Sequence, residues 1–191
     1  MGRLVYAPIA SLDGYVADDA GRFDWAAPDA EVHGFVNDLV RPLGTQLYGR
    51  RTYEVLQAWE TMGQDPSDHP IERDFAEIWR SSDKVVFSRS LSSVPTARTR
   101  LEHTFDAAAV RQLKASRDAD LSIGGPQLAG QAIRAGLVDE IHLLLAPVLV
   151  GGGTAALPEG VRADLELVSQ RRFASGFVHL HYTAHRPGQE R

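Results

Sequence analysis

The chain has 191 residues, of which 43% are hydrophobic and 24% charged, and its formal net charge is −5 at pH 7. This composition is typical of a globular domain with a substantial core, and the acidic balance argues against a dedicated nucleic-acid-binding protein. The chain has no cysteine, which excludes disulfides, thiolate catalysis and cysteine-ligated metal sites. Because no apolar run reaches membrane-spanning length and no secretory signal or lipid anchor is recognisable, the sequence predicts a cytoplasmic protein.

The first half of the chain predicts alternating strands and helices. A strand is expected over residues 4–10, followed by a loop that contains Asp13-Gly14. Pro28-Asp29 then opens an amphipathic helix, in which apolar side chains recur at helical spacing from Val32 to Val40. Further along, the pattern predicts a strand at 45–48, a helix at 50–58, a polar loop at 63–70 and a helix at 71–79.

The second half continues this alternation and then changes character. Strands are expected at 84–87 and 100–103, a helix capped by Asp106 up to residue 116, a strand at 121–123, a helix at 127–135 and a long strand at 140–150. The segments 165–173 and 177–184 are joined at Ser175-Gly176, which is typical of a hairpin. The whole pattern predicts one α/β domain over residues 1–185, with a mixed, mostly parallel sheet, helices on both faces, a C-terminal antiparallel hairpin and a frayed tail at 186–191.

Gly124-Gly125-Pro126 stands where a short apolar strand meets the next predicted helix. Residues without side chains allow close approach of the backbone to a ligand, and a helix N-terminus offers free N–H groups and a positive dipole end to an anion. Neither the G-x-G-x-x-G dinucleotide motif nor the P-loop motif occurs in the chain. Taken alone, these residues favour an ordinary strand–turn–helix junction.

Two further junctions resemble this one. A predicted strand ends at Gly49-Arg50-Arg51-Thr52, and another ends at Ser88-Arg89-Ser90. Arginine in the first turn of a helix opposes the dipole unless an anion is bound, although a solvated pair is the alternative. Ligands of open α/β sheets bind beyond the carboxyl ends of the strands, so three such junctions favour one extended, multiply phosphorylated ligand. Arginines without acidic neighbours favour NADPH over NADH, because the 2′-phosphate requires cations.

An ordered set of motifs resembles the dihydrofolate reductase superfamily. More narrowly, the set is similar to the branch of the C-terminal reductase domain of the riboflavin-biosynthesis deaminase/reductase. The resemblance covers roughly residues 4–182 and rests on Ser11-Leu-Asp-Gly14, Gly49-Arg-Arg-Thr-Tyr-Glu54, Val86-Phe-Ser-Arg89, Gly124-Gly-Pro126, Leu137-Val-Asp-Glu140 and Pro147-Val-Leu-Val-Gly-Gly-Gly153. It implies an NADPH-dependent reductase that passes hydride to a small heterocyclic substrate.

The resemblance also implies roles for individual residues. The cofactor would be held by Ile9, Ala10, Val16, Gly49, Arg50, Arg51, Thr52, Ser88, Arg89, Gly124, Gly125, Pro126, Gln127 and Leu128, and the substrate by Ser11, Asp13 and Trp25. A cis peptide between Gly124 and Gly125 is one option that the family suggests. Glu31, with Asp29 as the other option, is the candidate catalytic carboxylate, because it corresponds to the one that binds the pterin in dihydrofolate reductases. Either is also an ordinary acidic residue of a helical first turn.

The substrate is less constrained than the cofactor. Dihydrofolate reductases carry a threonine on the strand that faces the carboxylate, whereas this chain has Leu143-Leu-Leu-Ala-Pro147. Ser11-Leu-Asp-Gly14 is closer to the riboflavin-type reductases, although their deaminase domain is missing here. We therefore expect 5-amino-6-(5-phosphoribosylamino)uracil or a related heterocycle as substrate. The alternatives are a pterin substrate and a non-catalytic NADP-binding module.

Three other features are open to two interpretations. His179, His181 and His185 suggest a metal site, but no acidic or cysteine partner is near them in the sequence, so an exposed strand face without a metal is expected. Gly151-Gly-Gly153 suggests either a substrate phosphate contact or a tight turn. The strand at 141–150 and the C-terminal hairpin are expected to form a homodimer interface.

Overall fold

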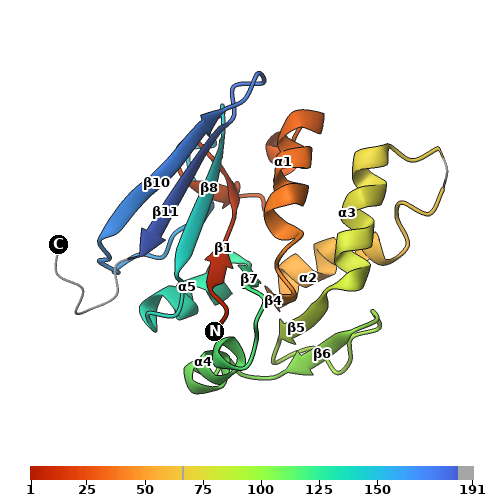
Figure 1. The fold of residues 1–191 in the computed structure, drawn as a ribbon. Helices are drawn as coiled ribbons and strands as arrows, with labels where there is room; N and C mark the ends of the chain where they lie inside the picture. Colours follow the sequence, from red (N-terminus) through yellow and green to blue (C-terminus); the bar gives the residue numbers. More distant parts are fainter. Residues whose placement is uncertain (66, 185–191) are drawn as a thin grey trace.

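One large, mostly parallel sheet forms the centre of the molecule in the computed structural model, which describes residues 1–65 and 67–184 (Figure 1). Its strands are β1 (Leu4–Tyr6), β2 (Ile9–Ser11), β4 (Thr45–Gly49), β5 (Asp83–Phe87), β6 (Thr99–Glu102), β7 (Leu121–Gly124), β8 (Glu140–Ala146), β10 (Leu165–Arg172) and β11 (Val178–Ala184). The order is β10-β11-β8-β1-β7-β4-β5-β6, with β2 paired to β8. Only the pairs β8–β11 and β10–β11 are antiparallel within this sheet.

Helices cover both faces of the sheet, as the sequence predicts. They are α1 (Ala30–Val40), α2 (Arg50–Leu56), α3 (Pro70–Ser81), α4 (Ala107–Ala115) and α5 (Pro126–Arg134), with 3-10 turns at Asp24–Ala26 and Gln57–Glu60. Successive strand residues point to opposite faces. On β5, for example, Val85 packs in the cluster of α4 and α5, whereas Val86 packs with Trp79 of α3. The expected three-layer α/β fold is therefore confirmed.

Prolines shorten two of the expected strands. The segment 4–10 is divided at Ala7-Pro8 into β1, which lies between β7 and β8, and β2, which pairs only with β8. Pro8 has no N–H to donate to a ladder, but its carbonyl accepts a hydrogen bond from the Leu144 N–H at 3.1 Å. The strand expected over 140–150 ends at Ala146, directly before Pro147. The helix that begins at Arg50 also ends early, at Leu56, and continues as a 3-10 turn.

A second small sheet was not predicted. It pairs β3 (Tyr15–Ala17) with β9 (Thr154–Ala155) and so ties the loop after β2 to the segment that follows the triple glycine. Gly153 has φ +125°, and a Cβ there would collide with the Ala17 carbonyl oxygen. Of the three glycines, Gly153 therefore serves close backbone packing, whereas a Cβ at Gly151 would meet nothing within 4 Å.

The described part of the chain contains no helix long and apolar enough to cross a membrane. The predicted frayed tail at 186–191 lies outside the described residues, as does His185.

Candidate functional site

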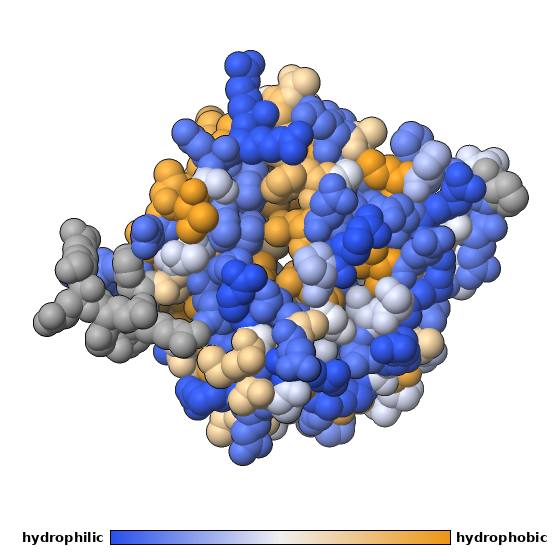
Figure 2. Space-filling model, in the orientation of Figure 1, coloured by the Kyte–Doolittle hydropathy of each residue, from blue (hydrophilic) through white to orange (hydrophobic). Residues whose placement is uncertain are grey.

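A cavity of about 1130 Å³ lies where β4, β5 and β7 end. The three junctions singled out in the sequence all line it: Gly49–Thr52, Ser88–Ser90 and Gly124–Leu128. Parallel neighbours make this convergence unavoidable, because β7 pairs with β4 and β4 with β5 in the same direction. Figure 2 shows apolar side chains within a hollow at the centre of the face in view, between more hydrophilic surroundings.

Contacts between the junctions hold two of them together directly. The Arg50 guanidinium donates to the Glu54 carboxylate at 2.7 Å through Nε and to the Ser90 hydroxyl at 2.8 Å through Nη1. The Ser88 hydroxyl accepts hydrogen bonds from the N–H groups of Ser90 and Leu91, at 3.2 and 3.1 Å. The turn after β5 is thus held in a fixed shape against the first residues of α2.

The two glycines of the third junction lie where side chains would not fit. A Cβ at Gly124 would be 2.7 Å from the Tyr48 ring, and a Cβ at Gly125 would be 2.8 Å from the Thr52 hydroxyl oxygen. Gly125 has φ +94° and is the N-cap residue of α5, where no side chain caps the helix. The first residues of α5 line the cavity, so their free N–H groups are available to a ligand there. No described peptide bond is cis, so the Gly124–Gly125 peptide is trans and the cis option is wrong.

The charge of the cavity lining is entirely of one sign. Arg50, Arg51 and Arg89 line it, and no Asp or Glu does among the described residues. Arg51 and Arg89 are exposed, and within the described part of the chain neither has an acidic group in ion-pair distance, in contrast to Arg50. Two guanidiniums without partners beside uncapped helix N–H groups fit a phosphorylated ligand.

The other end of the cavity is apolar. Ile9 of β2, Val16 of β3 and Leu144 of β8 line it, together with Val36 and Leu39 of α1. Ala10 is fully buried and is not among the lining residues, although both of its predicted companions, Ile9 and Val16, are. This arrangement is typical of a pocket for an aromatic or heterocyclic ring.

The predicted substrate residues lie outside this lining and have structural partners. The Ser11 hydroxyl accepts from the Tyr15 N–H at 3.0 Å, and Asp13 accepts from the Gly151 N–H at 2.7 Å. Hydrogen bonds from the Ser11 hydroxyl and from the backbone of Gly151 and Val150 hold the pKa of Asp13 below its ordinary value. Trp25 donates to the Arg22 carbonyl at 3.2 Å and packs against the buried cluster that contains Val32 of α1. These residues fix the loop between β2 and α1.

The two candidate carboxylates are also engaged elsewhere. Asp29 caps α1 and accepts from the Val32 N–H at 2.9 Å, and this bond, with one from the Ser175 hydroxyl, lowers the pKa of Asp29. Glu31 accepts from Arg171 at 3.0 Å and from the Ala174 N–H at 3.1 Å. Neither residue lines the cavity. A carboxylate with a lowered pKa is a poor proton donor near neutral pH, so the contacts favour a structural role for Asp29.

Sequence reasoning missed the contribution of the chain after β6. His103, Thr104 and Phe105 line the cavity, and the His103 Nδ1 lies 3.1 Å from the Ser88 carbonyl oxygen. The available signal was positional: residues 100–103 were expected to form a strand, and β6 runs parallel to β5, so its carboxyl end meets the same edge of the sheet.

The histidine pattern of the last strand has a different environment from the one expected. His179 is buried rather than exposed, and Glu140 and His142 of β8 face β11 on the same side of the sheet. The expectation that no acidic partner is near is wrong, because the Glu140 Oε2 lies 3.3 Å from the His181 Nε2. The sequence alone does not reveal this partner, because Glu140 lies on β8 and His181 on β11.

Comparison with known proteins supports the fold and defines the family. The model of the RibD C-terminal domain family matches residues 3–179. The uncharacterized protein YyaP of Bacillus subtilis is 29% identical over 182 residues, which are 94% of this chain and 94% of that protein.

Solved structures of related fold include three of interest. A putative riboflavin biosynthesis protein from Shewanella sp. PV-4 has a TM-score of 0.74 at 23% identity, covering 97% of this chain and 100% of the other. The Thermotoga maritima diaminohydroxyphosphoribosylaminopyrimidine deaminase/5-amino-6-(5-phosphoribosylamino)uracil reductase has a TM-score of 0.66 at 15% identity, covering 96% of this chain and 56% of the other. Enterococcus faecalis dihydrofolate reductase, complexed with NADP(H), has a TM-score of 0.65 at 12% identity, covering 96% and 97%.

These structures share the fold of this chain, a dihydrofolate reductase-like arrangement of sheet and helices. The family match extends over nearly all of the described residues, from before β1 to the second residue of β11. The chain belongs to the RibD C-terminal domain family.

Proposed function

We propose that this protein is an NADPH-dependent reductase of a small heterocyclic substrate. The observation that carries the proposal is the convergence of three strand-end junctions on one cavity lined by three arginines and, among the described residues, no carboxylate. The glycine pair supports it further, because a Cβ at either position would collide with its neighbours. Without side chains, the backbone of this pair can be approached closely by a pyrophosphate.

The residues present fit NADPH in two parts. Gly124–Leu128 and Thr52 would hold the pyrophosphate, and Arg51 and Arg89, with Arg50 and Ser88 beside them, would hold the 2′-phosphate and the adenosine ribose. Ile9 and Val16 would flank the nicotinamide and exclude water from it. When bound, NADPH supplies the hydride, and the protein supplies orientation and electrostatics.

The size and polarity of the cavity bear on the substrate. A volume of about 1130 Å³ exceeds the roughly 300–1,000 Å³ typical of one small-molecule pocket, so there is room for a second ligand beside the cofactor. Its apolar end contains no carboxylate among the described residues, which weakens the pterin alternative. We therefore favour the riboflavin-type substrate, 5-amino-6-(5-phosphoribosylamino)uracil or a related ribosylated pyrimidine, over dihydrofolate.

A titration and a turnover assay together test the function. NADPH is expected to quench tryptophan fluorescence with a single-site isotherm, and to be oxidised when the ribosylaminopyrimidine phosphate is added but not with dihydrofolate. Binding without oxidation of NADPH by either compound would favour the non-catalytic module, and absence of binding at millimolar NADPH would reject the proposal.

The same assay separates the two roles of the candidate carboxylates. We expect Glu31→Gln and Asp29→Asn to retain NADPH affinity and turnover within about threefold, and Asp29→Asn to keep the wild-type stability, because asparagine caps a helix about as well as aspartate. A loss of turnover in either variant, with unchanged NADPH affinity and stability, would instead assign proton transfer to that carboxylate.

We further propose that the protein is a homodimer through β10. This strand forms one of the two edges of the sheet, and its exposed apolar residues include Leu165, Leu167 and Val168. Antiparallel self-pairing about a twofold axis near residue 169 would bring Glu166 of one copy opposite Arg172 of the other, so the edge is complementary to itself.

Sedimentation velocity tests this assembly directly. The wild-type protein is expected to sediment as a dimer, and Leu167→Glu as a monomer, because the new carboxylate would be buried at the pairing edge. Met62→Glu, which changes a residue of similar exposure away from β10, is the control. A monomeric wild type, or a dimeric L167E, would contradict this interface.

A further inference from the structure

A cluster of histidines and one carboxylate lies away from the cavity, at the amino-terminal end of β8. Glu140 and His142 come from β8, and His179 and His181 come from β11. None of the four lines the cavity, which is at the carboxyl-terminal ends of the parallel strands. Glu140, His142 and His179 are buried, with 4–6% of each residue exposed, and none of the four is used by the proposed reductase function.

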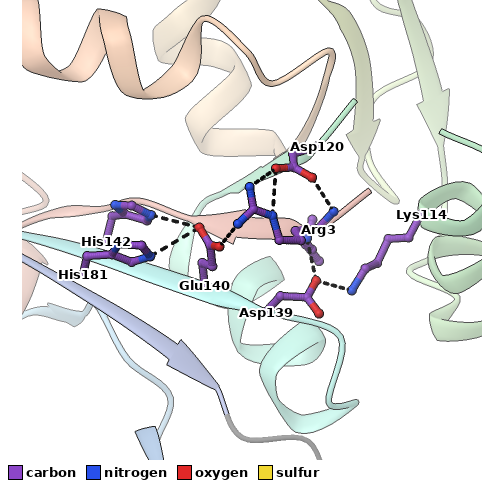
Figure 3. Close-up of polar contacts among 8 residues, drawn as sticks. Arg3, Lys114, Asp120, Asp139, Glu140, His142 and His181 are labelled. Atoms are coloured by element: carbon purple, nitrogen blue, oxygen red, sulfur yellow. Dashed lines mark hydrogen bonds and ion pairs between the residues drawn. The ribbon is translucent and has the colours of Figure 1, made fainter. Parts of the chain in front are cut away.

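Strand register brings these side chains to one face of the sheet. His181 of β11 is the direct cross-strand partner of His142, and their rings stack with centroids 3.9 Å apart. Glu140 precedes His142 by two residues, as His179 precedes His181, so the alternation of a strand places all four on the same side. Figure 3 shows both imidazoles directed at one carboxylate oxygen of Glu140.

Two of the three distances match those between neighbouring ligands of a tetrahedral metal ion. The Glu140 Oε2 lies 3.3 Å from the His142 Nε2 and 3.3 Å from the His181 Nε2, and all three ligand atoms lie within 4.8 Å of one another. Zinc bonds to nitrogen and oxygen of about 2.0–2.2 Å place neighbouring tetrahedral ligands about 3.3–3.5 Å apart.

A second observation concerns the His181 Nε2. This nitrogen is buried and has no hydrogen-bond partner among the described residues, because its contact with Glu140 lacks hydrogen-bond geometry. A buried polar atom without a partner is costly unless something else satisfies it. A metal ion between the three ligand atoms would do so.

We propose that Glu140, His142 and His181 bind one divalent transition-metal ion of the zinc type. Two histidines and a carboxylate form a ligand set that such ions prefer, and three protein ligands leave one tetrahedral position for water. The site would link β8 to β11 and so stabilise the antiparallel end of the sheet, independently of cofactor binding.

Neighbouring groups orient the ligands in the way metal sites require. The Arg3 guanidinium contacts the other oxygen of Glu140 and also pairs with Asp120 at 2.7 Å, so Glu140 presents Oε2 to the histidines while Asp120 offsets the cation (Figure 3). The His142 Nδ1 lies 3.0 Å from the His179 Nε2. When His179 Nε2 accepts the His142 Nδ1 proton, the His142 Nε2 lone pair is left for the metal.

Calorimetric titration of untagged, chelator-treated protein with Zn²⁺ tests the site. We expect one Zn²⁺ per chain, with affinity at least about 100-fold weaker in Glu140→Gln and in His181→Gln. His69→Gln, which changes an exposed histidine at the start of α3, should bind like the wild type. Co²⁺ in place of Zn²⁺ should give the visible absorption of a tetrahedral complex, and this absorption should be lost in H181Q.

Thermal unfolding shows whether each variant is folded. Added Zn²⁺ should raise the melting temperature of the wild type and of H69Q but not of H181Q, whose side chain is partly exposed and tolerates glutamine. Absence of Zn²⁺ binding by the wild type, or equal binding by the wild type, E140Q and H181Q, would overturn the proposal. Neither result depends on NADPH, so it leaves the reductase proposal untouched.

Discussion

Replacing Gly125 with alanine is expected to weaken NADPH binding at least about 100-fold, equivalent to about 2.7 kcal/mol. The residue has φ +94°, a conformation that costs a residue with a side chain about 1–3 kcal/mol. The new Cβ would also lie 2.8 Å from the Thr52 hydroxyl oxygen, inside the junction that would hold the pyrophosphate. To relieve the strained φ and the close contact, the backbone would have to move away from Thr52. This movement would disrupt the surface that the phosphates would contact.

Fluorescence titration measures the change in NADPH affinity, and chemical denaturation measures the change in the free energy of unfolding. The control is Gly136→Ala: Gly136 also has a positive φ, +63°, but a Cβ there meets nothing within 4 Å and the residue does not line the cavity. Gly136→Ala should therefore lose stability without losing NADPH affinity. Unchanged affinity in a folded Gly125→Ala protein would show that the cofactor does not use this backbone.

The parts of the molecule that the sequence predicted well depend on local signals. Asp29 and Asp106 cap helices where the sequence indicated, and Gly49 and Gly124 end strands that lead into helices, at once after Gly49 and one residue later after Gly124. Because parallel strands end at one edge of the sheet, these local junctions were sufficient to predict a shared cavity. The proximity of Arg50 to Ser90 follows from the same register.

The parts that were missed depend on pairing between distant segments. The small sheet β3–β9 pairs Tyr15 with Ala155. With three residues in β3 and two in β9, both segments are too short to carry a strand pattern of their own. The same holds for the histidine cluster, because the register between β8 and β11 decides that Glu140 faces His181. Glu31 illustrates a different limit. Its position in the first turn of α1 could be predicted, but its hydrogen bonds from Arg171 and the Ala174 N–H of the hairpin could not.

Replacing Arg51 and Arg89 together is expected to change the preference between NADPH and NADH by at least about 100-fold. Both side chains line the cavity, and within the described residues neither has an acidic partner, so a bound phosphate would be their main electrostatic partner. A hydrogen bond to a charged group contributes about 1.5–3 kcal/mol, so the loss of two guanidiniums should far exceed a tenfold effect. NADH lacks the 2′-phosphate and should bind the double alanine variant almost as it binds the wild type.

Parallel titrations with NADPH and NADH at two ionic strengths test this preference. The double variant Arg111→Ala and Arg162→Ala, which removes two exposed arginines outside the cavity, controls for the change in net charge. In the wild type the NADPH preference should fall as the pH drops below about 6, because a phosphate monoester then loses its second charge, and it should fall further with added salt. The double variant of Arg51 and Arg89 should show neither dependence. Equal loss of NADPH and NADH affinity would instead assign both arginines to the pyrophosphate that the two cofactors share, and unchanged affinity for both would remove them from the binding site.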